Sequence, residues 1–250
     1  MTEAGKEQRL LDHLLGLPKE KLNSIRGNPA KVLEVIDEYN DNVEWFMSIG
    51  PIKGKVIVEK IRETKPQIMI ELGGYVGYSA ILFASTMGDL GKYYTFEASE
   101  EYATIARKIV DLAGLSLKVE IFVGKAGRTL PEFEEKLALR KRGHARIDFT
   151  FIDHDKGLYL PDLRVLESLG MIAPGTTIVA DNIYYADVPE YVAYIKSSPE
   201  EKREHNYDIV NISGKEFPGR WNILYETKTV EVREVLDAME ISKCIEYLDG

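Results

Sequence analysis

The stretch spanning residues 68–83 constrains the fold more than any other part of the chain. An apolar run leads into Glu71, three glycines follow at 73, 74 and 77, and Ser79 then opens an apolar helical pattern. Glycine permits positive φ and lets a ligand approach the backbone closely, and the N-terminus of a helix presents free N–H groups. This order predicts a strand, a glycine loop and a helix, which in α/β sheets surround a cofactor.

Segments typical of strands and helices alternate through the middle of the chain. Each of the first four expected strands is followed by an expected helix. Such alternation with short connections predicts an α/β fold, in which helices cover both faces of a mostly parallel sheet. The expected strands are 67–71, 93–97, 118–123, 147–152 and 177–180, and the expected helices begin near 79, 99, 128 and 159.

The two ends of the chain depart from this alternation. Three N-terminal amphipathic helices are expected, at 6–17, 28–46 and 53–64. Near the other end, the runs 208–212 and 221–225 predict an antiparallel hairpin at the sheet edge, and apolar spacing over 229–248 predicts a final helix. We therefore expect one domain over 1–250, made of N-terminal helices (1–65), an α/β core (66–227) and a C-terminal helical tail (228–250).

The composition restricts the partners that such a chain can have. A net charge of −9 argues against binding the phosphate backbone of a nucleic acid and against electrostatic docking on anionic membranes. No apolar run approaches the roughly 20 residues of a membrane span, and the first residues lack a signal-peptide pattern. The sole cysteine, Cys244, excludes an intrachain disulfide and a cysteine metal site. We expect a cytoplasmic protein that is monomeric or weakly homo-oligomeric.

An acid stands at the end of the second expected strand. Glu97 lies 20 residues past Gly77, where a carboxylate can accept hydrogen bonds from the hydroxyls of a ribose. This pattern is compatible with any adenosine cofactor, NAD included. The alternative is a solvated acid that only caps the following helix.

Two later strands also run directly into polar residues. Asp153 follows one buried strand, and Asp181 and Asn182 follow the next. Because the carboxyl ends of neighbouring parallel strands meet at one edge, these side chains should come together. Two carboxylates and an amide oxygen suit Mg²⁺, and without a cation the carboxylates would repel each other. The alternative is that both aspartates only begin loops and cap helices.

Lys156 lies three residues after Asp153 and is the candidate general base. A divalent cation nearby favours the neutral amine, which can accept a proton from a substrate. The alternative is a surface lysine paired with Asp153 or Asp155. His154 can either contact the base of a cofactor or pack within the loop.

Taken together, these residues resemble the catechol O-methyltransferase family. The resemblance runs from about Lys6 to Tyr225 and rests on the glycine stretch 71–79, Glu97, and the motifs 153–156 and 180–182. It implies a Rossmann-like methyltransferase fold with a mostly parallel seven-stranded sheet. It also implies S-adenosylmethionine as methyl donor, Mg²⁺ as cofactor and a small aromatic with vicinal hydroxyls as acceptor.

The resemblance also implies a role for each matching residue. The metal would be held by Asp153, Asp181 and Asn182, and Lys156 would remove the proton of the attacking hydroxyl. The substrate would contact Trp45, Met47, Lys156 and Asn182. The cofactor would contact Ile49, Glu71, Gly73, Tyr75, Ser79, Glu97, Ala126, Asp153 and His154.

Several positions depart from the family pattern. Asp155 stands where the family often has a tryptophan, Ala186 where it has a proline, and Gly127 where a glutamine contacts adenine. The family's late-strand glutamate falls near Ile212, with Asn211 and Glu216 as neighbours, so no carboxylate is clearly matched. Two alternatives therefore stay open: an NAD-dependent oxidoreductase, and a non-catalytic cofactor-binding protein whose acceptor pocket has degenerated.

Overall fold

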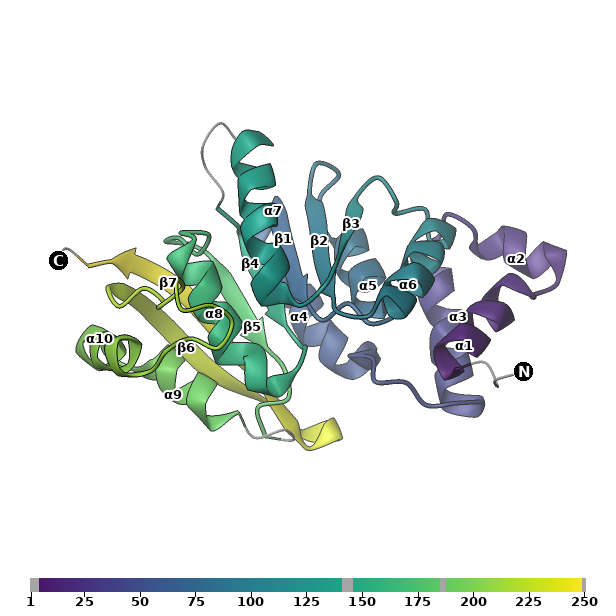
Figure 1. Cartoon of the computed structure of the whole chain (residues 1–250). Coiled ribbons are helices and arrows are strands. Elements are labelled where there is room, and N and C mark those ends of the chain that lie inside the picture. The colour runs from purple at the N-terminus through teal and green to yellow at the C-terminus, as the bar shows by residue number, and fades with distance from the viewer. Residues whose placement is uncertain (1–4, 141–145, 185–187, 249–250) are drawn as a thin grey trace.

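The computed structural model describes residues 5–140, 146–184 and 188–248. Within these residues, seven strands form one sheet in the order β3-β2-β1-β4-β5-β7-β6 (Figure 1). The first five strands pair in parallel and β7 pairs antiparallel with β5 and β6, so the predicted α/β fold class is confirmed. The strands are β1 (Ile68–Leu72), β2 (Lys92–Glu97), β3 (Val119–Val123), β4 (Phe149–Ile152), β5 (Thr177–Ala180), β6 (Ile223–Val232) and β7 (Asp237–Tyr247).

The register of the central strands places the polar residues at one edge. Leu72 of β1 pairs with Ile152 of β4, and Ile152 pairs with Ala180 of β5. The next residues along the three strands are therefore the glycine loop, Asp153 and Asp181. Their meeting at the carboxyl edge is the placement expected for a ligand site in a parallel sheet.

Helices cover the two faces of the sheet with separate apolar clusters. Met69 of β1 packs with the first cluster, whereas its neighbours Ile68 and Ile70 pack with the second, as the two-residue period of a strand requires. The first face carries α3 (Pro29–Asn42), α4 (Gly50–Thr64), α5 (Tyr78–Thr86) and α6 (Glu100–Leu112). The second carries α7 (Ala126–Arg140), α8 (Tyr159–Ser168) and α9 (Pro189–Lys196).

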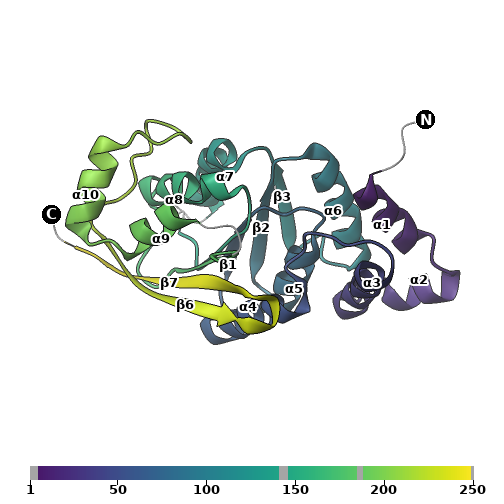
Figure 2. The ribbon, with the colours of Figure 1, turned by 90° about the horizontal axis from the view of Figure 1, so that it is seen from below.

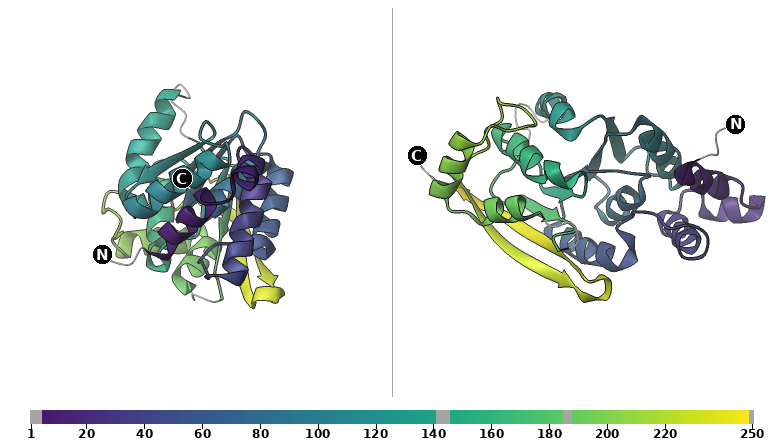
Figure 3. Two further views of the ribbon diagram at one scale, coloured as in Figure 1. Left: turned by 90° about the vertical axis from the view of Figure 1, so that its right-hand side faces the viewer. Right: turned by 60° about the horizontal axis from the view of Figure 1, so that its bottom comes forward.

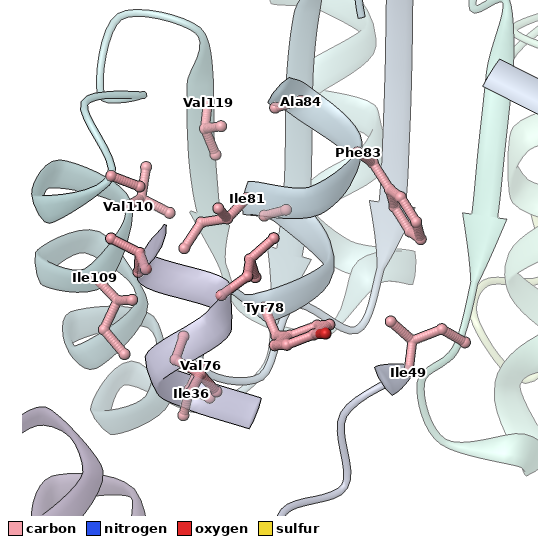
Figure 4. Close-up of a cluster of buried hydrophobic side chains, with 14 of the residues drawn as sticks. Ile36, Ile49, Val76, Tyr78, Ile81, Phe83, Ala84, Ile109, Val110 and Val119 are labelled. Atoms are coloured by element: carbon pink, nitrogen blue, oxygen red, sulfur yellow. The ribbon is translucent and has the colours of Figure 1, made fainter. Parts of the chain in front are cut away.

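Helix α5, which follows the glycine loop, is the centre of the first cluster. Its residues Ile81, Phe83 and Ala84 are fully buried. They meet side chains of α3 and α6 and of the loop before α4 (Figure 4). This apolar surround holds the N-terminus of α5 firmly at the carboxyl edge of the sheet.

The N-terminal helices form one end of the molecule and α10 the other (Figures 1 and 3). The expected start of the second long helix is confirmed, since the Asn28 side chain accepts a hydrogen bond from the Lys31 N–H (3.2 Å). That helix ends at Asn42, before the expected Phe46, and the next begins at Gly50. Helix α1 spans Lys6–Leu15, and the short helix α2 (Lys19–Ile25) was not expected.

The predicted helical tail over 228–250 is wrong. Residues 223–232 and 237–247 are β6 and β7, which pair from Ile223 with Tyr247 to Val232 with Asp237. The stretch 226–229 alternates charged and β-branched residues, a period of two that suits an edge hairpin better than a helix. The hairpin also satisfies the fully buried Glu240, which accepts hydrogen bonds from the hydroxyls of Thr227 and Thr229.

The expected hairpin of 208–212 with 221–225 is also wrong, apart from the start of β6. Residue 208 ends α10 (Pro199–Asp208), and 209–222 connect this helix to β6. Helix α10 begins with a capping box, in which Ser198 accepts from the Glu201 N–H and the Glu201 side chain accepts from the Ser198 N–H. This signal is visible in the sequence Ser-Pro-Glu-Glu, and it competes with the strand pattern that follows.

No helix in the described residues is long and apolar enough to cross a membrane.

Candidate functional site

The glycine loop presses against the ends of β2 and β4. Gly73 and Gly77 have φ of 97° and 91°, a region that favours glycine. A Cβ on Gly73 would lie 2.5 Å from the carbonyl oxygen of Asp153, and one on Gly74 would lie 2.4 Å from Oγ1 of Thr95. Only glycine allows this approach, which brings the loop beside the predicted metal ligand Asp153.

Glu97 braces the glycine loop from the end of β2. Its buried carboxylate accepts hydrogen bonds from the Tyr75 N–H (2.7 Å) and the Ser99 N–H (2.8 Å). Ser99 in turn caps α6, as expected, by accepting from the Tyr102 N–H. Each Glu97 oxygen keeps a second lone pair, so the bracing role and the predicted ribose contact are compatible. The Tyr75 hydroxyl points to the N-terminal helices and donates to Glu7 (2.6 Å).

Glu71 is a fully buried acid at the end of β1. Within the described part of the chain neither of its oxygens has a hydrogen-bond partner of normal geometry. Burial raises the pKa of Glu71 to about 7, against the opposing effect of the hydroxyls of Ser79, Thr95 and Tyr93. A buried carboxyl group of this kind favours either a proton or a cationic ligand.

The residues predicted to bind a metal come together. The Lys156 ammonium lies 2.8 Å from Oδ1 of Asp153 and 2.8 Å from Oδ1 of Asn182, and it donates to the Tyr159 hydroxyl (2.6 Å). Two oxygens contributed by different strands thus face one cation. Asn182 holds this position with a φ of 58°.

Two further residues belong to this cluster and were missed in the sequence. The ammonium of Lys53 on α4 lies 2.8 Å from Oδ1 of Asp181 and 2.5 Å from Oδ2 of Asp237. Asp237, at the start of β7 beside α4 (Figure 2), also accepts from the Asn182 side-chain amide (2.9 Å). Because the amide nitrogen is held by Asp237, the amide oxygen must face Lys156.

A signal for Lys53 was present in its helix. Lys53 falls four and eight residues before Ile57 and Ile61, which are buried at 0% and 1% exposure, and is itself only 8% exposed. A lysine on the apolar stripe of an amphipathic helix needs a buried partner. Asp237 carries no such signal, because the apolar spacing of its segment predicts a helix.

Burial and charge interactions together shift the pKa values of this cluster. Burial and the nearby Asp153 carboxylate raise the pKa of Asp181 to about 6, against the opposing effect of Lys53. Burial also raises the pKa of Asp153, although Lys156 opposes it. Burial disfavours the ammonium of Lys53, but the Asp181 and Asp237 carboxylates outweigh that effect and raise its pKa. The cluster therefore concentrates negative charge that a cation stabilises.

The remaining predicted cofactor residues lie in the loop after β4 and at the starts of α7, α5 and α4. The His154 ring stacks on Tyr159 with centroids 5.3 Å apart, and its Nε2 lies 2.9 Å from Oδ2 of Asp162. Ala126 is buried at the start of α7, and Ser79 is buried in the first turn of α5. Ile49 is buried where α4 begins.

Trp45 and Met47 lie in the loop that leads into α4. Both side chains are exposed, at 66% and 60%, and Lys6 lies over the Trp45 ring (5.3 Å to the centroid). Among the described residues no contact joins either of them to the Asp153 cluster. Their predicted role at the substrate stays a prediction.

The structure shows where most of the residues that depart from the family pattern lie. Asp155 caps the turn Lys156–Leu158 by accepting from the Gly157 N–H (3.0 Å), and Ala186 lies outside the described residues. Ile212 lies in the connection before β6 and Asn211 is buried there, so neither is on the late strand. Two carboxylates lie on β6, Glu226 and Glu231. Glu231 pairs with Ala238, the neighbour of Asp237, and accepts from the Tyr184 hydroxyl (3.4 Å).

The donor set is limited to two carboxylates and an amide. Among the described residues, no three His, Cys, Asp or Glu side chains are grouped as metal ligands. Asp153, Asp181 and Asn182 nevertheless supply hard oxygen donors of the type that Mg²⁺ takes, with room for further oxygen ligands from solvent or substrate. The oxygens of Asp153 and Asn182 already face one cation, the Lys156 ammonium.

Solved structures share this fold. A putative O-methyltransferase from Klebsiella pneumoniae matches with a TM-score of 0.59 and 20% identity, over 98% of this chain and 92% of that one. An O-methyltransferase from Bacillus cereus, solved in complex with SAH, matches with a TM-score of 0.56 and 21% identity, over 94% and 96%. At these identities the likeness concerns the fold.

Sequence comparisons identify the family. Residues 24–198 match the family model described as O-methyltransferase. Bovine catechol O-methyltransferase is 33% identical over 89% of this chain and 78% of its own length, and the mouse enzyme is 36% identical over 77% and 69%. The human protein named transmembrane O-methyltransferase is 30% identical over 70% of this chain and 59% of its own length. The chain is therefore an O-methyltransferase and belongs to the catechol O-methyltransferase family.

Proposed function

We propose that the protein transfers a methyl group from S-adenosylmethionine, with Mg²⁺, to one hydroxyl of a catechol or a similar small aromatic diol. One observation carries the proposal: the oxygens of Asp153 and Asn182 converge on the Lys156 ammonium at the carboxyl edge of the sheet, directly beside the glycine loop. A cation site, an amine and a cofactor loop are thereby adjacent. The family membership argues against both an NAD-dependent oxidoreductase and a non-catalytic protein.

The cofactor is assigned to the glycine loop and its acids. In this proposal Glu97 accepts from ribose hydroxyls, and the free N–H groups at the start of α5 lie beside the loop. The buried carboxyl of Glu71, without a hydrogen-bond partner among the described residues, suits the ammonium group of the methionine part. Asp153, His154, Ala126, Ser79 and Ile49 complete the proposed contacts.

The metal is assigned to Asp153, Asp181 and Asn182. When bound there, Mg²⁺ would stabilise the phenolate that forms as the hydroxyl loses its proton. Asp237 holds the amide of Asn182 with its oxygen toward the site, and Lys53 balances the charge of Asp181. These two residues keep the oxygen donors in place.

Lys156 is assigned as the general base. Its neutral amine would take the proton from one acceptor hydroxyl, and the resulting oxyanion would attack the methyl carbon. The O–C bond forms while the C–S bond breaks, and the sulfonium becomes a neutral thioether. Tyr159 and Asn182 orient the amine through hydrogen bonds. Trp45 and Met47 are proposed to contact the aromatic ring.

Activity assays with catechol test this assignment. EDTA should abolish turnover and added Mg²⁺ should restore it. The variant Lys156→Ala should lower kcat by about 100-fold or more, in the range of a lost general base, while the affinity for S-adenosylhomocysteine stays unchanged. The exposed Lys55→Ala on α4 is the matched control and should leave kcat unchanged. An unaltered kcat in Lys156→Ala would rule out the base.

A further inference from the structure

The segment between α10 and β6 folds back beside α8 and α7 (Figures 1 and 2). We call residues 209–219 the return segment. Arg164 of α8 donates to the carbonyl oxygens of Pro218 (2.8 Å) and Ile209 (2.7 Å). The buried Asn211 donates to the carbonyl oxygen of Pro161 (3.0 Å). Two buried or half-buried side chains thus fix the return segment on the surface of α8.

Three elements meet at Gly127, in the first turn of α7. A Cβ on Gly127 would lie 2.8 Å from Oδ1 of Asp162 and 2.8 Å from Cβ of Ser213. Real Cβ contacts are not this short, so a side chain at 127 would displace either α8 or the return segment. The return segment therefore occupies the space that a residue other than glycine would fill.

A chain of hydrogen bonds connects the return segment to the loop after β4. The Ser213 hydroxyl donates to Oδ1 of Asp162 (2.6 Å), and Oδ2 of the same carboxylate lies 2.9 Å from Nε2 of His154. Because a carboxylate only accepts, the imidazole proton is on Nε2. In a neutral ring Nδ1 is then an acceptor, and among the described residues this buried atom has no partner.

The position of this junction follows from the proposed function, on which the inference rests. With the methionine part at Glu71 and the ribose at Glu97, the adenine falls beyond Glu97, between the start of α7 and the loop after β4. Ala126 begins α7, His154 lies in that loop, and Ser213 is joined to His154 through Asp162. We propose that the return segment is the outer wall of the adenine end of the cofactor site, held in place by the Ser213–Asp162 hydrogen bond.

Titration calorimetry with two ligands tests the wall. S-adenosylhomocysteine carries the adenine, whereas S-ribosylhomocysteine has the same ribose and amino acid without it. Ser213→Ala should weaken S-adenosylhomocysteine about 10-fold, the effect of one hydrogen bond to a charged group, and leave S-ribosylhomocysteine unchanged. Gly127→Ala should act in the same direction by displacing the segment. Ser198→Ala, which removes the cap of the neighbouring α10, is the matched control and should change neither affinity.

Unchanged S-adenosylhomocysteine affinity in Ser213→Ala would overturn the inference, as would an equal loss for both ligands, since neither result depends on adenine. Hydrogen exchange on the unaltered protein is a second test: S-adenosylhomocysteine should protect the amides of 209–219 and S-ribosylhomocysteine should not. Failure of the unaltered protein to bind S-adenosylhomocysteine at all would instead overturn the proposed function.

Discussion

The ammonium of Lys53 lies 2.5 Å from Oδ2 of Asp237, which is 184 residues further along the chain. It also lies 2.8 Å from Oδ1 of Asp181. All three side chains are buried. Helix α4, on the first face of the sheet, is thereby joined to the antiparallel strand β7 by one cluster of charged side chains at the site.

Replacing Lys53 with methionine should destabilise the protein strongly. The change leaves the Asp181 and Asp237 carboxylates buried without their counter-charge, a loss of about 3 kcal/mol or more in the free energy of unfolding at pH 7. The loss should be smaller at pH 5, where the raised pKa of Asp181 allows protonation. Urea unfolding measures both values. Lys60→Met, which removes a surface pair with Glu63 on the same helix, should cost less than about 1 kcal/mol; equal losses in the two variants would contradict the buried-cluster account.

Replacing Asp237 with asparagine should weaken metal binding. The Asp237 carboxylate accepts a hydrogen bond from the side-chain NH₂ of Asn182. An asparagine at 237 can both donate and accept, so it no longer fixes which end of the Asn182 amide faces the site. Residues that orient metal ligands typically change affinity by about 10-fold or more, and Mn²⁺ titration followed by electron paramagnetic resonance measures this loss. Asp148→Asn is the control, because Asp148 binds backbone N–H groups of 67 and 68 at the opposite edge of the sheet. Mn²⁺ affinity equal to that of the unaltered protein would remove Asp237 from this role.

Glu71 should make stability depend on pH. Its pKa is about 7 in the folded protein against an ordinary value of 4.5, so the folded state binds the proton more tightly. Stability is therefore greatest below pH 4.5 as far as this group is concerned, and it falls as the pH rises toward 7, by about 3 kcal/mol. Glu71→Gln should reduce this slope in urea unfolding, most clearly between pH 6 and 7, above the raised pKa of Asp181. The exposed Glu59→Gln should retain it in full, and a slope in Glu71→Gln equal to that of the unaltered protein would assign the effect to another group.

Replacing Glu231 with glutamine should affect the acceptor and spare the cofactor. Glu231 on β6 pairs with Ala238, the neighbour of Asp237, and accepts from the Tyr184 hydroxyl. We predict that it also accepts from a second hydroxyl of the acceptor. Losing one hydrogen bond to a charged group should raise KM for catechol about 10-fold without changing S-adenosylhomocysteine affinity. Glu226→Gln, five residues earlier on the same strand, is the control. If both variants have the same KM as the unaltered enzyme, Glu231 does not contact the acceptor.

Local patterns were sufficient for the centre of the fold. The five parallel strands, the glycine loop and the caps at Asn28 and Ser99 were predicted close to where the structure has them. Each depends on neighbours within a few residues, such as a side chain that accepts an N–H three positions on. The meeting of Asp153 with Asp181 and Asn182 was also predictable, because parallel strands bring their carboxyl ends to one edge.

The C-terminal third was predicted poorly because its local patterns are ambiguous. Residues 229–248 have apolar spacing that fits a helix, yet the pairing of β7 with β5 and of β6 with β7 makes them strands. The same pairing carries Asp237 to Asn182 and buries Glu240 under the hydroxyls of Thr227 and Thr229. No spacing in the sequence predicts these pairs of interacting residues.

The sequence alone therefore determined the cofactor loop, the acids that follow the strands and Lys156, since these follow from short-range order along each strand and turn. The tertiary structure alone decided what surrounds them: Lys53 on Asp181, Asp237 on Asn182, and Ser213 against Gly127. These contacts join residues far apart in the chain. They form because a buried charge or hydrogen-bonding group must find a partner when the core closes.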